Sequence, residues 1–442
     1  MNYVRLLVAA LLGMTVVCGS GCGRNKPAAT RPAARPAGAG QTPANPAARA
    51  PGPGVTVAAA PADEVAALAP KTLPPAGSKA VDARRLAMAQ ADLNEGLTFL
   101  LTQRNRDGGW GFAPGRSHPA LTAMALKAFS QHPDYGGDSP VVAKGFECLL
   151  KFRQPDGGFY VPEEGNINYV TSVSVMALAA AGNPRHKEVL DKAVAFLRGQ
   201  QIVPDSRDPK NEVISKDHPY VGGVSYGRHG RPDLSNEGMW ISAMHAAGVP
   251  GDDPAMQRAL AFVKRLQNRT EGTEGQSFVV RGEDDGGFVY AVRRQGATFV
   301  PESKAGEGPK GLRSYGSMTY IGFMSMLYAS AAKDDPRVVA AYDWIRKYWR
   351  LDSNPNMPEA QSREGLYYYY HVFAKALSAW GHDIIPDTRG VKHNWRHELI
   401  EMLNRQQKAN GSWANTASRW MEKSPVLVTC YSVLALQEAL GG

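Results

Sequence analysis

The stretch KFRQPDGGF, residues 151–159, decides how this chain folds, because it recurs with variations along the sequence. A first copy, LTQRNRDGGW, occupies residues 101–110, and looser copies contain Gly222-Gly223-Val224, Asp285-Gly286-Gly287-Phe288 and Asn410-Gly411-Ser412-Trp413. Each copy follows one helical pattern and precedes another. Repeated supersecondary units stack and bury their apolar faces on one another, so the repeat determines the fold.

Two kinds of helical pattern alternate around these copies. Amphipathic patterns, with polar residues on one face, predict helices over residues 91–105, 141–154, 187–201, 254–268, 337–351 and 393–408. Patterns with few charges, rich in Ala, Met, Ser, Thr and aromatic residues, predict helices over residues 118–131, 168–181, 234–247, 317–332, 367–380 and 425–440. A helix that is apolar all round must be buried. The sequence therefore predicts an all-α fold, an (α/α)6 toroid with six outer helices around six inner ones.

The repeat resembles that of a known family. A Gln, then Asp-Gly-Gly and an aromatic residue, leading into an Ala-rich inner helix, is similar to the repeat of protein prenyltransferase β subunits and of squalene or oxidosqualene cyclases, which form α/α toroids. The resemblance covers about residues 85–442. In that family the repeat residues are structural and tie helix ends together. The resemblance implies this role for Gln103, Asp107, Trp110, Gln154, Asp156, Phe159, Gln407 and Trp413.

The motifs that carry the chemistry of this family are missing from the sequence. Squalene-type cyclases protonate an alkene with an Asp-x-Asp-Asp motif, whereas the nearest cluster here, residues 283–285, runs into a Gly-Gly turn. Prenyltransferases hold zinc with an Asp, a Cys and a His. Tyr370-His371 is similar to the Tyr-His of that site, and Cys430 could face His371, but no third ligand follows from the sequence. We expect no metal and no cofactor, and we assign no catalytic residue.

Topology predicts where a ligand would bind. All six inner helices run in the same direction, so their N-termini converge on one mouth whose parallel dipoles favour anionic or polar groups. Asp233 and Glu237 fit a helix N-cap sequence, and a second interpretation gives Glu237 and His371 a shared polar grip on a ligand. The candidate ligand-binding residues at this mouth are Arg231, Asp233, Glu237, Tyr315, Tyr370 and His371.

The N-terminal region predicts export and a tether. Residues 1–22 contain a short apolar stretch after Arg5 and end in Gly19-Ser20-Gly21-Cys22, which resembles a bacterial lipoprotein signal with lipidation at Cys22. Ordinary secretion with cleavage nearby is the alternative. Residues 23–84 are rich in Ala, Pro and Gly, as is typical of a disordered tether, and residues 85–442 form the toroid. We expect a membrane-anchored protein of the bacterial cell envelope.

Composition narrows the function. The formal charge is +9, but the Lys and Arg residues are scattered, so we expect no nucleic-acid partner. Three functions remain: binding of an apolar or isoprenoid-like molecule in the central cavity, a cyclase-like or prenyltransferase-like enzyme, or an envelope scaffold for a protein partner that the sequence does not identify. An insertion over residues 270–309 is either a lid over the mouth or, as we expect, a surface loop.

Overall fold

The computed structural model describes residues 61–75, 77, 78, 80–136, 139–208, 211–227, 230–271, 280 and 282–441. The predicted lipidation site Cys22 and most of the predicted tether lie outside these residues. Within the described ranges, none of the helices combines the length and apolar character needed to cross a lipid bilayer.

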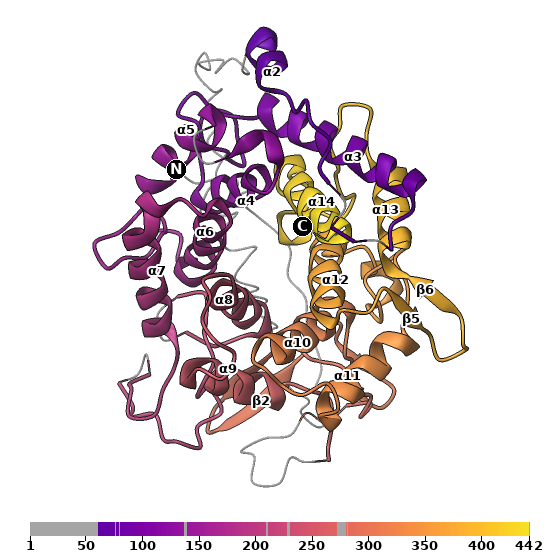
Figure 1. The fold of residues 1–442 in the computed structure, drawn as a ribbon. Coiled ribbons are helices and arrows are strands. Elements are labelled where there is room, and N and C mark those ends of the chain that lie inside the picture. Colours follow the sequence, from indigo (N-terminus) through magenta and orange to yellow (C-terminus); the bar gives the residue numbers. More distant parts are fainter. Residues whose placement is uncertain are drawn as a thin grey trace, which may run out of the picture.

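Two concentric rings of helices form the described part of the molecule (Figure 1). The outer ring consists of α3 (Ala83–Thr102), α5 (Pro140–Leu150), α7 (Lys187–Gln200), α9 (Pro254–Arg265), α11 (Pro336–Lys347) and α13 (Trp395–Gln406). The inner ring consists of α4 (Pro119–Ser130), α6 (Ile167–Ala181), α8 (Leu234–Ala246), α10 (Gly316–Tyr328), α12 (Leu366–Trp380) and α14 (Pro425–Leu440). Each inner helix contacts the next, and α14 contacts α4, which closes the ring. The predicted all-α toroid is confirmed.

Burial separates the two rings as the sequence pattern predicts. The inner helix α14 buries nearly its whole length, including its polar residues Thr429 and Ser432. The outer helix α7 buries only Ala193, Phe196 and Leu197. An all-round apolar surface is stable only when neighbours cover it, and the outer ring provides that cover.

The first glycine of each Gly-Gly turn meets the next outer helix. Gly108 adopts φ +91°, which favours glycine, and a Cβ atom there would lie 2.6 Å from the Lys144 carbonyl oxygen on α5. Gly411 likewise packs on α3, where a Cβ atom would lie 2.4 Å from the Glu95 carbonyl oxygen. A side chain would therefore push adjacent outer helices apart, including the pair that closes the ring.

The residue after each glycine pair is fastened to the inner helix that follows. The backbone N–H of Trp110 donates to Thr122 Oγ1 at 3.0 Å, and that of Phe159 donates to Thr171 Oγ1 at 2.9 Å. The same bond joins Phe288 to Thr319 and Trp413 to Thr429. In the third repeat the acceptor is a carboxyl group instead, because Val224 donates to Glu237 Oε2 at 2.8 Å.

Glutamine ties join neighbouring outer helices at three junctions. The Gln201 side-chain amide donates to the Gly222 carbonyl and to Ala255 on α9, and Gln267 donates to the Gly286 carbonyl and to Arg337 on α11. Gln407 donates to the Gly411 carbonyl and to Asp92 on α3, at 3.0 and 2.9 Å. The role predicted for Gln407 is therefore present, and it holds the last outer helix to the first.

Gln103 and Gln154 do not make this tie. The Gln103 amide donates only to Thr102 Oγ1, and the Gln154 amide donates to the carbonyls of Phe152 and Tyr160 in its own turn. In the last repeat the residue after the tying glutamine, Lys408, donates its backbone N–H to the carbonyl of the residue after the first glycine, Ser412. In the first two repeats Asn105 and Gln154 make this bond, to Gly109 and Gly158. The residues that precede them, Arg104 and Arg153, therefore occupy the position of the tie, and the predicted assignment of Gln103 and Gln154 is wrong.

The acidic residue of the repeat caps its turn. Asp107 Oδ1 accepts the Gly109 N–H at 3.0 Å, and Asp156 Oδ1 accepts the Gly158 N–H at the same distance. Asn410 does the same for Ser412 at 3.2 Å. A single oxygen is enough for this turn, which explains why Asn can replace Asp.

The fifth repeat has no Gly-Gly turn. The Glu422 side chain binds the backbone at the start of its inner helix instead. Glu422 reaches the start of α12 from the loop before α14, where it accepts the N–H groups of Tyr368 and Tyr367 at 2.7 and 3.3 Å. Asn415 Nδ2 also donates to it at 2.6 Å. Burial raises the pKa of this carboxyl group to about 7, although these hydrogen bonds lower it.

The described residues before α3, namely 61–75, 77, 78 and 80–82, include a part that packs on the ring. Helix α2 (Ala62–Leu68) and the residues after it lie along the ring, where the N–H groups of Lys71 and Thr72 donate to Asp134. The Tyr135 hydroxyl donates to the Leu68 carbonyl at 2.6 Å. The predicted disorder of residues 23–84 is therefore wrong for its last part, because these hydrogen bonds and the contacts of Val65 and Leu68 with the core hold it in place.

Short elements complete the described part of the chain. Three antiparallel pairs join β1 (Ala291–Gln295) to β2 (Thr298–Glu302), β3 (Glu307–Gly308) to β4 (Gly311–Leu312), and β5 (Ile384–Pro386) to β6 (Lys392–Asn394). In the first pair Ala291 lies opposite Glu302. Four 3-10 turns occupy Pro133–Tyr135, Pro184–His186, Glu359–Gln361 and Arg419–Met421. The insertion predicted as a loop therefore contains a hairpin.

Replacing Gln407 by Ala should lower the free energy of unfolding by about 1–2 kcal/mol, because two buried carbonyl groups lose their donor where the ring closes. Gln103→Ala is the matched control, since both residues occupy the C-cap position of an outer helix and Gln103 makes no tie between helices. Its loss should stay below about 0.5 kcal/mol. Urea unfolding followed by circular dichroism measures both, and equal losses would refute the role of the tie.

Glu422→Gln should change how stability depends on pH. The carboxyl group of Glu422 has a pKa of about 7 in the folded protein and the ordinary value of 4.5 in the unfolded chain, so it stays protonated up to a higher pH in the folded state. It therefore destabilises the folded protein as pH rises from about 4.5 to 7, by a total of about 3 kcal/mol. The unfolding free energy of Glu422→Gln minus that of the wild type should grow over this range and then level off. A difference that does not vary with pH would contradict the raised pKa.

Candidate functional site

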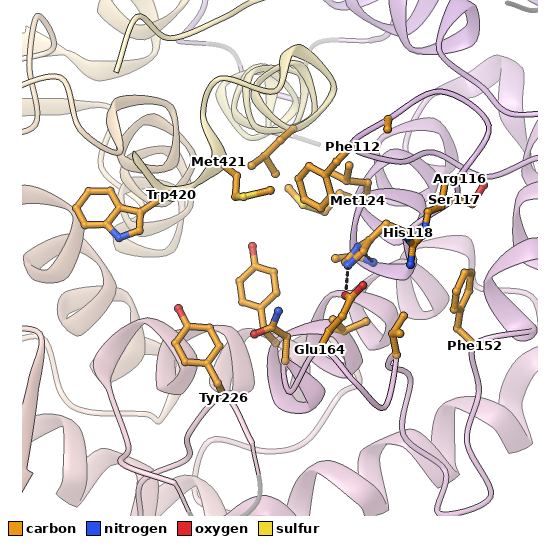
Figure 2. Close-up of a pocket in the computed structure, with 18 of the residues that line it drawn as sticks. Phe112, Arg116, Ser117, His118, Met124, Phe152, Glu164, Tyr226, Trp420 and Met421 are labelled. Carbon is orange, nitrogen blue, oxygen red and sulfur yellow. Dashed lines mark hydrogen bonds and ion pairs between the residues drawn. The ribbon is translucent and has the colours of Figure 1, made fainter. Parts of the chain in front are cut away.

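A cavity of about 490 Å³ opens among the N-terminal ends of the inner helices (Figure 2). Its walls come from α4, α6 and α14, from the loops that lead into them and from the loop before α8. Most of the lining is apolar or aromatic: Phe112, Ala120, Leu121, Met124, Phe152, Val161, Tyr169, Val170, Tyr226, Trp420, Met421, Leu427 and Tyr431. The cavity lies at the mouth where the sequence predicts ligand binding, although none of the six predicted residues lines it.

A histidine–carboxylate pair lies at one end of the cavity. His118 Nε2 and Glu164 Oε2 are 2.8 Å apart, and Figure 2 shows Trp420 across the cavity from them. His118 is the N-cap of α4, where its Nδ1 accepts the Ala120 N–H at 3.2 Å. Because Nδ1 accepts, the neutral ring carries its proton on Nε2 and donates it to Glu164. Both ring nitrogens of His118 are therefore engaged by protein groups, and the pair places a buried carboxylate in the cavity wall.

The opposite wall contains a strained segment. Trp420 and Met421 have φ values of +54° and +67°, which is unusual for large side chains and costs about 1–2 kcal/mol per residue. Arg419 holds the segment through an ion pair with Glu364 at 2.6 Å, and its guanidinium group lies 4.5 Å from the centre of the Trp420 ring. These contacts fix the Trp420 ring where it lines the cavity.

A second cavity of about 80 Å³ adjoins the first and shares Tyr169, Tyr226, Trp420 and Tyr431 with it. Its other lining residues are Ser235, Tyr290, Tyr315, Ser317, Met318 and Tyr368. The hydroxyl groups pair with one another: Tyr169 with Tyr431 at 3.1 Å, and Ser235 with Tyr368 at 2.9 Å. Burial raises the pKa of these tyrosines, so their hydroxyl groups stay protonated.

Three of the predicted rim residues lie at or beside this second cavity. Tyr315 lines it directly. Asp233 caps α8, where it accepts the Asn236 N–H at 3.0 Å, and it is 1% exposed. Arg231 forms an ion pair with Glu302 on β2, and its guanidinium group lies 5.5 Å from the centre of the Tyr290 ring. The insertion therefore forms part of the wall of the small cavity and is not only a surface loop.

The predicted grip of Glu237 and His371 is not formed. Glu237 occupies the position that Thr holds in other repeats, and it accepts the Val224 N–H behind the cavity wall. Burial raises its pKa well above the ordinary value. His371 lies instead beside a narrow space of about 10 Å³ that Lys127 and Lys375 also line. Burial lowers the pKa of His371 far below its ordinary value, and the two lysines lower it further.

Tyr370 does not line any of these three cavities. Its hydroxyl donates to the Leu351 carbonyl at 2.6 Å, beyond the end of α11, and it accepts a hydrogen bond from Gln406 on α13. Tyr370 therefore fastens an inner helix to the outer ring. A spacing argument along α12 could not tell this direction from the opposite one.

The two cysteines that the structure describes are buried in the ring. Cys148 and Cys430 are both free, and burial raises the pKa of Cys148 to about 11 and that of Cys430 further. Among the residues that the structure describes, no three His, Cys, Asp or Glu side chains lie close enough together to hold a metal ion.

The sequence prediction missed His118, Glu164 and Trp420. Their positions could have identified two of them, since His118 and Glu164 lie just before the first and second inner helices. Asp233 and Tyr315 were selected because they lie just before the third and fourth. Neither His118 nor Glu164 belongs to a recognisable motif. Their pairing depends on how two loops 46 residues apart meet, and spacing along the chain does not show this.

Comparison with known proteins indicates what the chain is similar to. No protein-family profile matches it. Drimenyl diphosphate synthase of Streptantibioticus cattleyicolor is 28% identical over 172 residues, 38% of this chain and 29% of that protein. Drimenyl diphosphate synthase of Streptomyces showdoensis is 30% identical over 220 residues, 44% of this chain and 38% of that protein. Squalene–hopene cyclase of Bradyrhizobium diazoefficiens is 22% identical over 176 residues, 38% of this chain and 27% of that protein. The chain thus matches less than two fifths of the length of these relatives.

Solved structures agree on the fold. A variant of the type II terpene cyclase MstE from Scytonema, without ligand, superposes with a TM-score of 0.51 and 14% identity over 82% of this chain and 99% of that one. A second MstE variant, in complex with the substrate geranylgeranyl dihydroxybenzoate, gives a TM-score of 0.50 and 13% identity over 81% and 99%. The chain therefore has the α/α-toroid fold of these type II terpene cyclases.

Proposed function

We propose that this chain binds an apolar, isoprenoid-like or lipid-like ligand in the large cavity at the N-terminal ends of its inner helices. The observation that carries the proposal is the cavity itself, about 490 Å³ in volume and lined mainly by apolar and aromatic side chains. Pockets of this size and lining are typical of small-molecule sites. Because the inner helices are packed along their length, the mouth is where such a ligand fits.

Similarity to the terpene cyclases supports an isoprenoid chain as the ligand. The MstE structure with comparable fold contains a geranylgeranyl compound as its substrate. The present chain lacks the Asp-x-Asp-Asp acid motif of squalene-type cyclases. Binding is therefore our first proposal. A cyclase-like or prenyltransferase-like enzyme is the second proposal, supported by the carboxyl group of Glu164 in the cavity wall, which could act as an acid or a base toward a bound ligand.

We also propose that the N-terminal segment anchors the protein to a membrane of the bacterial envelope through a lipid on Cys22. The support is the sequence Gly19-Ser20-Gly21-Cys22 after an apolar stretch. A tether before residue 61 would let the toroid reach ligands at the membrane surface.

Val170→Trp should weaken ligand binding at least tenfold, because Val170 lines the cavity on α6 and the indole ring would fill the space that the ligand needs. The wild-type protein should yield a co-purified isoprenoid on organic extraction and mass spectrometry, and the variant should not. Val339→Trp on the outer helix α11 is the matched control, since Val339 is 42% exposed. Thermal unfolding checks that both variants fold.

The extracted ligand, together with an assay of the purified protein on added squalene, separates the two candidate functions. An unchanged isoprenoid supports binding, whereas conversion of added squalene to cyclic products supports the enzyme. An empty cavity in the wild type, with no affinity for added squalene or farnesol, would overturn both candidates and leave the envelope scaffold.

Cys22→Ser should abolish membrane attachment. In a bacterial host, the wild-type protein should incorporate radiolabelled palmitate and enter the detergent phase of Triton X-114, because an acylated N-terminal cysteine partitions into lipid. Cys18→Ser is the matched control and should behave like the wild type. Equal label in the wild type and in Cys22→Ser would show that Cys22 is not the anchor.

A further inference from the structure

Three polar side chains of the large cavity come together at one end of it, while the hydroxyl groups of Tyr169, Tyr226 and Tyr431 lie on the side shared with the second cavity. His118 and Glu164 meet there, and Asn166 lines the same cavity two residues after Glu164. The rest of the lining is mostly apolar, from Met124 on α4 to Trp420 on the far side. A ligand that fits this cavity therefore needs an apolar body and one polar end.

Asn166 is the clearest sign of a missing partner. It occupies the N-cap position of α6, yet its side chain makes no capping hydrogen bond. Its Oδ1 is buried without any hydrogen-bond partner, and the residue is 6% exposed. Leaving a buried polar atom unpaired costs about 1–3 kcal/mol, and a ligand that donates to it once the Asn166 side chain turns toward the cavity would recover part of that.

Glu164 also offers acceptor atoms to this end. Its Oε2 accepts from His118, and a carboxylate group has acceptor positions on both oxygens. Glu164 is 9% exposed, so its charge is weakly screened by water. An anionic head group beside it would be repelled, whereas a neutral donor would be attracted.

Arg116 does not reverse this preference. It lines the same cavity, but the residue is exposed, so solvent reduces its attraction for an anion. The groups that are buried at this end are the acceptors on Glu164 and Asn166. They are suited to a hydroxyl group and poorly suited to a diphosphate or carboxylate.

We propose that this end of the cavity binds the hydroxyl group of a long-chain isoprenoid alcohol, which donates to Glu164 or Asn166 while its chain extends along the apolar wall. The inference rests on the proposed ligand-binding function and names the head group. It distinguishes the ligand of this chain from the diphosphate compounds that give drimenyl diphosphate synthases their name.

Three probes with one carbon chain and different ends test the proposal. Farnesol, farnesyl diphosphate and the hydrocarbon farnesene are titrated into the full-length protein by isothermal calorimetry. We expect farnesol to bind at least tenfold tighter than the other two, because one hydrogen bond to a buried group corresponds to about this factor. Tighter binding of the diphosphate, lost in Arg116→Gln, would overturn the inference.

Two variants locate the head-group contact. Asn166→Leu and Glu164→Met keep the approximate side-chain volume and remove the acceptor atoms, so the tenfold ratio of farnesol affinity to farnesene affinity should fall to about one in each variant. Thermal unfolding shows that the variants still fold. Glu163→Met is the matched control, because Glu163 is the exposed neighbour of Glu164 and should leave farnesol binding as in the wild type.

The outcomes separate this inference from the proposed function. If farnesol and farnesene bind equally, or if both variants retain the preference for farnesol, the head-group inference fails and ligand binding stands. If none of the three probes binds, the proposed function fails, and the inference fails with it.

Discussion

The structure depends on how the backbone of each Gly-Gly turn is satisfied. The turn connects an outer helix to an inner one, so its N–H and C=O groups lie where two rings of helices meet and water cannot reach them. A threonine on the following inner helix accepts the N–H after the glycines in four of the repeats, as Thr122 does for Trp110. Glutamines such as Gln267 supply donors to the carbonyl groups and reach the next outer helix at the same time. The hydrogen bonds that stabilise a turn therefore also set the spacing of the ring.

Closing the ring places the cavity. Once α14 contacts α4, all the inner helices begin at the same face of the toroid, and the loops that precede them meet there. His118 comes from one such loop, Glu164 from the next and Trp420 from the last. Side chains of the loops that lead into the inner helices face this space, whereas the turn residues hold the helices. The repeat builds the scaffold, and the loops between its elements supply most of the polar groups of the site.

Glu237 stands at the position where four other repeats have Thr, and it keeps the structural role of that position. A carboxyl group at a place that otherwise holds Thr suggests a functional residue, and we predicted it as part of a ligand grip. The structure shows that it still accepts the N–H of its turn, at Val224, and that burial favours its neutral form. Glu422 performs a comparable task at the start of α12, where the Gly-Gly turn is absent. Both acids are explained by backbone hydrogen bonds that the repeat would otherwise provide with neutral side chains.

The sequence by itself determined the ring of six helix pairs, because a 3.6-residue apolar period and a recurring Gly-Gly-aromatic turn are local properties that survive without knowledge of contacts. It also located the mouth, since the direction of the inner helices follows from their order. It misplaced Gln103 and Gln154 by one position, because the first two repeats have Arg104 and Arg153 where Gln407 stands in the last, and a glutamine lies next to each of them. Only the tertiary structure decided which side chains share the cavity. Tyr370 turns outward to Leu351, His371 lies beside Lys375, and His118 meets Glu164, because each direction depends on the neighbour against which a helix packs. That neighbour lies far along the chain, and no local pattern encodes it.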